Sequence, residues 1–270
     1  MSLPAPAPDR TALVTGASAG IGVEIARELV RRGHGVTLVA RRAEKLESLA
    51  EELRARNVRV EVLAADLADR DARAAIPERV AEAGLTVDVL VNNAGLSTLG
   101  TVAKSDPEAE LQMIEVDVAA VADLCSRFVP GMVERGRGAV LNVASTASFQ
   151  PLPGQAGYGA CKAFVRSYTM ALDTELRGTG VTASALCPGP VETEFGDVAG
   201  FDLAETKAAM PSVMWESAAD VARCGVDAMA KGHQIAIPGT VNRVAAMASQ
   251  LAPKRFLLPI LANQHPGMKQ

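Results

Sequence analysis

An apolar run passes into a glycine-rich turn over residues 12–22, which read Ala-Leu-Val-Thr-Gly-Ala-Ser-Ala-Gly-Ile-Gly. Glycine lets a backbone turn sharply and approach a ligand closely, and the start of a helix offers free N–H donors to an anion. In the first strand-to-helix turn of a parallel sheet, this arrangement binds the pyrophosphate of a dinucleotide. The alternative is a glycine-rich turn that holds no ligand. The predicted cradle consists of Gly16, Ser18, Gly20, Ile21 and Gly22.

Further apolar, β-branched runs alternate with helical patterns rich in Ala, Leu, Glu and Arg. Because the runs are apolar throughout, they favour a parallel sheet that is covered on both faces. The 270 residues contain no internal linker or repeat. We therefore predict an α/β chain with a single-domain, Rossmann-like, doubly wound parallel sheet of about seven strands. The expected strands are Ala12–Thr15, Gly35–Ala40, Val58–Leu63, Val87–Val91, Gly138–Val143, Val181–Leu186 and Gln234–Ile237, and the expected helices include Gly22–Arg32, Ala43–Arg56, Asp69–Ala83 and Ala156–Arg177.

Composition excludes several classes of function. A net charge of −4 argues against a nucleic-acid partner, which requires a basic surface. The four cysteines form no Cys-x-x-Cys pair and the three histidines are far apart, so no metal site is predicted. The N-terminus lacks a basic head followed by an apolar run, and no uncharged run reaches membrane-spanning length. The expected location is the cytoplasm.

The residues at the end of the second strand indicate which nicotinamide cofactor the chain binds. An acidic residue there would bind an adenosine ribose and repel a 2′-phosphate, but this chain has Ala40 followed by Arg41 and Arg42. A guanidinium can bind a 2′-phosphate through paired, charge-assisted hydrogen bonds. The arginines therefore favour NADP(H) over NAD(H). The alternative is a surface arginine pair at the start of a helix. Asp66-Leu67 could place a carboxylate beside the adenine amino group, or Asp66 could simply cap the next helix.

A phenol and an ammonium lie four residues apart at Tyr158 and Lys162, on one face of a predicted helix. A phenol titrates near pH ~10, and a neighbouring ammonium in a shielded site lowers its pKa. Tyr158 could then pass a proton to or from a substrate oxygen. Ser145 ends the fifth strand at the same edge of the sheet, where its hydroxyl could hold that oxygen while charge develops.

Together these motifs resemble the short-chain dehydrogenase/reductase family, in its order and over residues 10–240. The resemblance rests on Thr15–Gly22, Asn92-Asn93-Ala94-Gly95, Ser145, Tyr158-x-x-x-Lys162 and the run Cys187-Pro188-Gly189-Pro190-Val191-Glu192-Thr193. It implies hydride transfer between NADP(H) and a carbonyl or secondary alcohol carbon, with a small-molecule substrate. It also implies homodimers or homotetramers that pair through helices at about Glu108–Val129 and Ala156–Arg177.

The resemblance also assigns cofactor contacts. Lys162 would hold the nicotinamide ribose, with Tyr158 beside it, and Arg41 would bind the 2′-phosphate. Val191 and Thr193 would anchor the carboxamide, and the loop after Thr193 would close over the substrate. The remaining cofactor contacts implied are Arg42, Asn93, Ala94, Gly95, Pro188 and Gly189.

The chain departs from the family in two places. The family has an asparagine where this chain reads Val116-Asp117-Val118, and that asparagine is thought to position a water that links the lysine to solvent. Asp117 could still accept those hydrogen bonds. Its negative charge would, however, stabilise the ammonium and partly cancel the lowering of the Tyr158 pKa by Lys162. Alternatively, Asp117 is merely tolerated at this position and has no role in the mechanism. Many relatives end with a strand and an Asp-Gly-Gly tail, but here Ile235-Ala-Ile-Pro-Gly-Thr-Val-Asn-Arg243 leads into a basic, apolar extension. This difference weakens an acyl-carrier-protein reductase assignment and the usual tetramer.

The expected organisation is a flexible tail over residues 1–9, an NADP-binding domain over 10–240 with a substrate loop at 189–216, and a C-terminal extension over 241–270. That extension could dock on a subunit or cover the substrate mouth, which we favour, or lie on a membrane. The loop residues Phe195, Phe201, Met210, Met214 and Trp215 could build a pocket for an apolar substrate. A 3-oxoacyl thioester reductase, a hydroxy-acid or sugar dehydrogenase and a nucleotide-sensing regulator remain alternatives.

Overall fold

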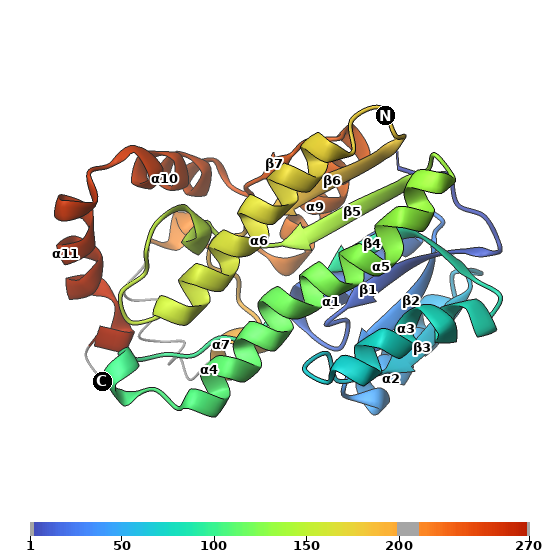
Figure 1. The fold of residues 1–270 in the computed structure, drawn as a ribbon, viewed down its shortest axis with the longest axis horizontal. Helices are drawn as coiled ribbons and strands as arrows, with labels where there is room; N and C mark the ends of the chain where they lie inside the picture. Colours follow the sequence, from blue (N-terminus) through green and yellow to red (C-terminus); the bar gives the residue numbers. More distant parts are fainter. Residues whose placement is uncertain (1–2, 199–210, 269–270) are drawn as a thin grey trace.

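A computed structural model of the chain describes residues 3–198 and 211–268. Seven strands form one parallel sheet in the order β3-β2-β1-β4-β5-β6-β7 (Figure 1). The predicted Rossmann-like, doubly wound fold is confirmed. The strands are β1 Arg10–Thr15, β2 Gly35–Ala40, β3 Val60–Ala64, β4 Thr86–Asn92, β5 Gly138–Val143, β6 Val181–Leu186 and β7 Ile235–Ala236.

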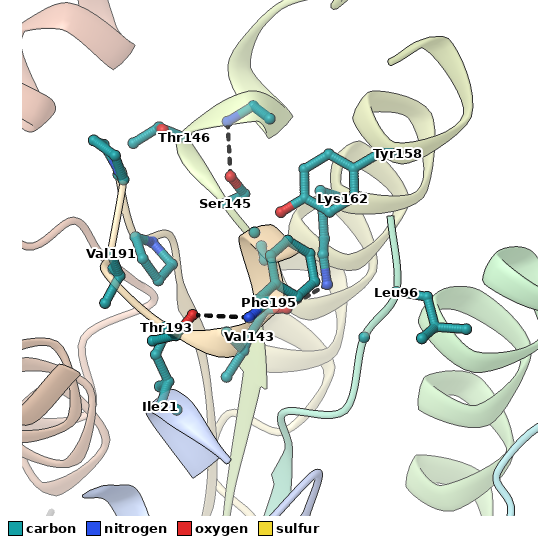
Figure 2. Close-up of a pocket in the computed structure, with 18 of the residues that line it drawn as sticks. Ile21, Leu96, Val143, Ser145, Thr146, Tyr158, Lys162, Val191, Thr193 and Phe195 are labelled. Atoms are coloured by element: carbon teal, nitrogen blue, oxygen red, sulfur yellow. Dashed lines mark hydrogen bonds between the residues drawn. The ribbon is translucent and has the colours of Figure 1, made fainter. Parts of the chain in front are cut away.

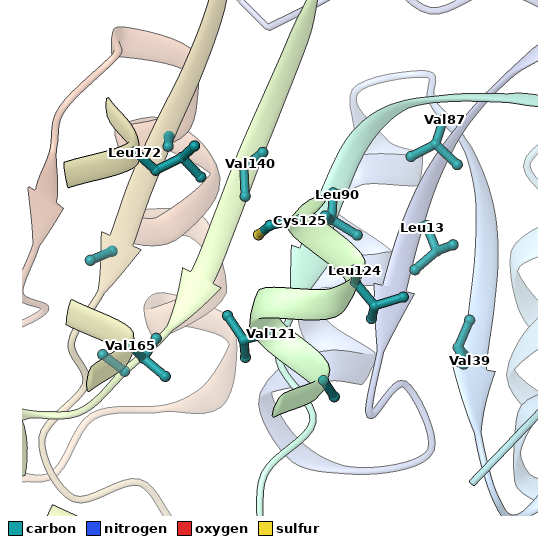
Figure 3. Close-up of a cluster of buried hydrophobic side chains, with 14 of the residues drawn as sticks. Leu13, Val39, Val87, Leu90, Val121, Leu124, Cys125, Val140, Val165 and Leu172 are labelled. Carbon is teal, nitrogen blue, oxygen red and sulfur yellow. The ribbon is translucent and has the colours of Figure 1, made fainter. Parts of the chain in front are cut away.

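Helices cover both faces of the sheet, which explains why the strands are apolar throughout. Helices α1 (Gly20–Arg31), α2 (Ala43–Arg54) and α9 (Ala218–Lys231) pack on one face. Helices α3 (Arg70–Glu82), α5 (Ala120–Glu134) and α6 (Ala156–Glu175) pack on the other. Figure 3 shows this second core, where Leu13 and Leu90 of the sheet lie near Leu124 of α5. Each such buried aliphatic side chain stabilises the fold by roughly 1.5–3 kcal/mol.

Every predicted strand is present, but four have different bounds: β1 and β4 are longer than predicted, β3 is shifted and β7 is shorter. β3 begins at Val60 rather than Val58, because Val60 is the first residue that pairs with β2. β7 has only two residues, since only Ile235 and Ala236 pair with β6. Bounds of this kind depend on the neighbouring strand, which a local apolar pattern does not report.

The long helix that was predicted from Glu108 to Val129 is composite. It consists of α4 (Pro107–Ile114), a π-helical turn η2 (Glu115–Ala119) and α5. Asp106 caps α4 by accepting a hydrogen bond from the backbone N–H of Glu108 at 3.1 Å. A π-helical turn inserts extra backbone into a helix and often marks a functional site. Here it carries Asp117, whose side chain is fully buried.

The carboxyl ends of the strands face the site and the C-terminal helices. The strand order reverses between β1 and β4, which is where ligands bind in open α/β sheets. Beyond this edge lies an arm made of α10 (Thr240–Leu251), α11 (Lys254–Gln264) and the short turn η5 (Pro266–Met268) (Figure 1). Within the described ranges, no helix combines the length and apolar character needed to span a membrane.

Candidate active site

The predicted cradle forms the turn between β1 and α1. Gly16 and Gly20 have φ angles of 64° and 56°, in the left-handed region that favours glycine. The N-cap of α1 is Ala19, whose methyl group cannot accept a hydrogen bond, so the first N–H groups of the helix are left for an anion. These features fit the pyrophosphate of a dinucleotide.

Gly22 lies behind the cradle, on the side away from the cavity. It is not among the residues that line the cavity, unlike the rest of the predicted cradle. A Cβ at Gly22 would lie 2.4 Å from the carbonyl oxygen of Gly16 and 2.5 Å from the amide nitrogen of Asn93. Gly22 therefore lets α1 pass close beneath the turn.

Thr15 ties the cradle to the end of β4, a role that the motifs alone did not reveal. Its hydroxyl accepts hydrogen bonds from the backbone N–H groups of Asn93 at 2.9 Å and Ala94 at 3.1 Å, and donates one to the carbonyl of Val91 at 3.2 Å. The Asn93 amide donates to the carbonyls of Thr15 at 2.9 Å and Gly16 at 3.3 Å. The Asn-Asn-Ala-Gly turn thus fixes the cradle as well as lining the cavity.

A cavity of about 820 Å³ runs from the cradle across the carboxyl ends of the strands to the C-terminal arm. Its volume lies within the usual range for sites of cofactors and small ligands. The predicted site residues that line it are Gly16, Ser18, Gly20, Ile21, Arg41, Arg42, Asp66, Leu67, Asn93, Ala94, Gly95, Ser145, Tyr158, Lys162, Pro188, Gly189, Val191 and Thr193. Asp117 lies behind the lining.

Basic and hydroxyl groups meet at the end of β2. Arg42 donates hydrogen bonds to the hydroxyl of Ser18, at 3.1 and 3.3 Å, and pairs with Glu194 at 3.0 Å. Arg41 lines the cavity with an exposed side chain. The exposed guanidinium of Arg41 and the Arg42 guanidinium beside the Ser18 hydroxyl fit a phosphate group at this end.

Asp66 lines the cavity after β3 and accepts a hydrogen bond from the backbone N–H of Ala68 at 2.9 Å. The suggestion that Asp66 caps the next helix is wrong. Asp69 is the N-cap of α3, because its carboxylate accepts from the N–H groups of Asp71 and Ala72. Asp66 therefore shapes the turn before the helix and faces the cavity.

Ser145, Tyr158 and Lys162 face the same part of the cavity (Figure 2). Ser145 follows β5, and its hydroxyl accepts a hydrogen bond from the N–H of Ala147 at 3.1 Å. The Lys162 ammonium lies 5.7 Å from the centre of the Tyr158 ring and donates to the carbonyl of Val143 at 3.3 Å. Strand β5 and helix α6 thus bring together a hydroxyl, a phenol and an ammonium.

The Lys162 ammonium forms a buried ion pair with Asp117. The carboxylate oxygen Oδ2 lies 2.9 Å from Nζ, and Oδ1 accepts a hydrogen bond from the backbone N–H of Leu96 at 2.7 Å. Burial acts to lower the pKa of Lys162, but the charges of Asp117 and Tyr158 outweigh it and raise that pKa above its ordinary value. The lysine therefore stays protonated. Asp117 can accept the contacts expected of the family's asparagine.

The pKa of Tyr158 differs from the expectation. Burial raises the pKa of the phenol above its ordinary value, and the negative charge of Asp117 adds to this rise. The Lys162 ammonium and a hydrogen bond with Ser145 pull the pKa down but do not outweigh burial. The expected net lowering is therefore wrong for this site, although the predicted direction of the lysine's own effect is confirmed.

The substrate loop and the arm form the opposite wall. The loop carries α7 (Glu194–Val198) and η4 (Ser212–Met214). The ring of Phe195 lies 5.9 Å from that of Tyr158, and Met214 and Trp215 also line the cavity. Phe201 and Met210, also expected in this wall, lie outside the described residues. The arm contributes Asn242, Ala245, Ala246, Ser249, Leu261, Gln264, His265 and Pro266, so it covers this end of the cavity.

A polar chain joins the arm to the rest of the site. The His265 ring shares a hydrogen bond with the Gln155 amide oxygen at 3.1 Å, and the Gln155 amide nitrogen donates to the Ser97 hydroxyl at 2.7 Å. No local motif marked Gln155 or His265, since the contact joins residues that are 110 positions apart. Among the residues that the structure describes, no cluster of three or more potential metal ligands is found.

Comparisons with known proteins agree with this geometry. Residues 10–200 match the family model described as short chain dehydrogenase. The NADP-dependent 3-hydroxy acid dehydrogenase YdfG of Salmonella typhi is 43% identical over 191 residues, which are 69% of this chain and 75% of that protein. The alignments with the first two curated relatives span 66% and 75% of those relatives' own lengths.

Two solved structures share the fold at a TM-score of 0.78. A short-chain dehydrogenase from Sphingobium yanoikuyae in complex with NADPH is 32% identical, and the match covers 93% of this chain and 95% of that one. A short chain dehydrogenase/reductase from Burkholderia phymatum in complex with NAD is 25% identical, with 88% and 92% covered. The chain belongs to the short-chain dehydrogenase/reductase family and is an oxidoreductase that uses a nicotinamide cofactor.

Proposed function

We propose that this protein is an NADP(H)-dependent enzyme that interconverts a carbonyl group and a secondary alcohol on an apolar substrate. One observation carries the proposal: Ser145, Tyr158 and Lys162 face a single cavity that also contains the glycine cradle. A nucleotide-sensing regulator would have no use for an acid and a positioned ammonium at the far end of such a cavity.

The bound nicotinamide supplies hydride in reduction and accepts it in oxidation. In reduction, the Ser145 hydroxyl donates a hydrogen bond to the carbonyl oxygen, and the Tyr158 phenol donates the proton that this oxygen needs. In oxidation, the Tyr158 phenolate removes the proton from the alcohol. The Lys162 ammonium stabilises the phenolate by its charge. Asp117 acts as a positioning residue, because it holds Lys162 without touching the cavity.

The preference for NADP(H) rests on Arg41, which follows β2, and on Ser18 in the turn after β1, because both line the cavity. Replacing Arg41 by alanine should raise KM for NADPH by about 10- to 100-fold, since one charge-assisted phosphate contact contributes roughly 1.5–3 kcal/mol. KM for NADH should change little. Steady-state kinetics with both cofactors checks this, with Arg54→Ala as the control for an exposed arginine away from the cavity. An equal rise of KM for both cofactors would show that Arg41 does not bind the 2′-phosphate.

The proposed substrate is apolar because apolar side chains line the substrate end of the cavity. Leu152, Phe195, Met214 and Leu261 line this end of the cavity. A 3-hydroxy acid, the substrate class in the name of one relative, is a second candidate. Its carboxylate would require a cationic partner. Among the described lining residues, the only lysine is Lys162, and the only arginines are Arg41 and Arg42 at the cofactor end. Burial lowers the pKa of His265, the one histidine among these residues, so it favours the neutral ring. These features favour the apolar substrate.

The test is a panel of ketones, secondary alcohols, 3-hydroxy acids and sugars, each assayed with NADPH or NADP⁺ and with NADH or NAD⁺. We expect kcat/KM to be highest for bulky apolar ketones and alcohols, and higher with the phosphorylated cofactor. Faster turnover of 3-hydroxy acids would support the second candidate. Cofactor binding without turnover of any compound in the panel would contradict an enzyme of this reaction class.

A further inference from the structure

The outward side of the C-terminal arm concentrates exposed apolar side chains. Of the thirteen large hydrophobic residues that are exposed in the described chain, seven lie between residues 241 and 268. We define the outer face of the arm as Val244, Met247, Leu251, Phe256 and Ile260, which are between 53% and 85% exposed. Patches of this kind mark surfaces that contact another molecule.

Helical spacing places these residues on one side of each helix. Val244, Met247 and Leu251 are separated by three and four positions on α10, so they lie on one side of that helix. Phe256 and Ile260 are four positions apart on α11. An amphipathic helix normally buries its apolar side, yet α11 contains no buried residue in the structure. The outer face is therefore unpartnered in the single chain.

Charge indicates what covers this face. Residues 240–268 contain Arg243, Lys254 and Arg255 and no aspartate or glutamate, although the whole chain has a net charge of −4. Arg243 and Arg255 are exposed. If the outer faces of two copies packed together, these basic residues would be brought together and would repel each other. An anionic lipid surface instead attracts basic residues and accepts the apolar side chains between its headgroups.

We propose that the outer face of the arm docks on an anionic membrane surface. The opposite side of the same arm lines the substrate end of the cavity through Ala245, Ser249 and Leu261. Docking would therefore hold the substrate end of the cavity next to the bilayer, where apolar compounds concentrate. The membrane contact does not depend on the proposed reaction, since lipid binding is measured without turnover.

The experiment uses the full chain and two kinds of vesicle, phosphatidylcholine alone and phosphatidylcholine mixed with phosphatidylglycerol, in a co-sedimentation assay at physiological ionic strength. The expected result is binding to the mixed vesicles, with an affinity at least about tenfold lower for vesicles of phosphatidylcholine alone and for the double variant Leu251→Ser/Phe256→Ser. Neither residue lines the cavity. The variant Arg243→Gln/Arg255→Gln should also bind more weakly and lose most of its dependence on salt.

The matched control is Val102→Ser/Val213→Ser, which removes two exposed apolar side chains from a different part of the surface and should bind like the parent. Far-UV circular dichroism confirms that each variant is folded. Failure of the parent to bind mixed vesicles, or equal binding by Leu251→Ser/Phe256→Ser and the control, would overturn the proposal. If sedimentation velocity shows that Leu251→Ser/Phe256→Ser dissociates an oligomer that does not bind lipid, a second copy covers the face and the proposal is wrong.

Discussion

Replacing Tyr158 by phenylalanine is expected to lower kcat for carbonyl reduction by about 10²- to 10⁴-fold, the usual contribution of general acid–base catalysis. The substitution removes only the hydroxyl group. The ring keeps its packing against Phe195, 5.9 Å away, and its position near the Lys162 ammonium, 5.7 Å away. The affinity for NADPH should therefore change little. Stopped-flow measurement of a single turnover, together with a fluorescence titration of NADPH, separates the loss of the proton donor from a loss of cofactor.

Tyr168 provides the matched control, because it is the only other tyrosine in the chain and does not line the cavity. Its ring stacks on that of Phe164 with centres 5.5 Å apart, so Tyr168→Phe removes a hydroxyl from the same helix at no cost to ring packing. Turnover by Tyr168→Phe should stay close to that of the parent. If Tyr158→Phe retained more than about a tenth of the parent's rate, the phenol would not be the proton donor.

Replacing Lys162 by methionine should lower both stability and activity. The change leaves Asp117 as a buried charge that has lost its partner 2.9 Å away, and breaking a buried pair in this way costs about 3–5 kcal/mol of unfolding free energy. Turnover should fall as well, because the phenolate of Tyr158 loses the ammonium that stabilises it. Urea denaturation and steady-state kinetics measure the two effects separately.

The double variant Lys162→Met/Asp117→Asn distinguishes the two roles of the lysine. Asparagine is nearly isosteric with aspartate and carries no charge, so the unpaired buried carboxylate is removed. The double variant should regain a large part of the unfolding free energy that Lys162→Met loses, while its turnover should stay low. Recovery of turnover along with stability would mean that Lys162 acts only as a structural partner of Asp117.

Much of the fold could be predicted because its signals are local. The strands are short apolar runs bounded by glycine, proline and charged residues, and each βα alternation carries its own pattern. The break in the helix after Ile114 could not be predicted in this way. It places Asp117 where its carboxylate meets Leu96 and Lys162, residues that are far away in sequence, and helical periodicity says nothing about such contacts.

The site likewise combines features that local motifs predict with features that depend on tertiary packing. Gly16, Ser145, Tyr158 and Lys162 stand at strand ends or within a short motif, and the structure brings all four to one cavity. The arm and Gln155 reach the cavity only through tertiary packing. The net pKa of Tyr158 was wrongly predicted for the same reason. The Tyr-x-x-x-Lys spacing reports the nearby ammonium, but the burial that outweighs it comes from the whole fold.

The most direct test of the central claim, that the Tyr158 phenol exchanges the proton with the substrate oxygen, is the pH dependence of alcohol oxidation. Oxidation requires the phenolate. Because burial holds the pKa of Tyr158 above its ordinary value, the phenolate is a minor form near neutral pH. We predict that kcat/KM for oxidation rises about tenfold per pH unit between about pH 5 and 7, while carbonyl reduction stays nearly constant. A flat oxidation profile over this range, in protein that remains folded, would contradict the account.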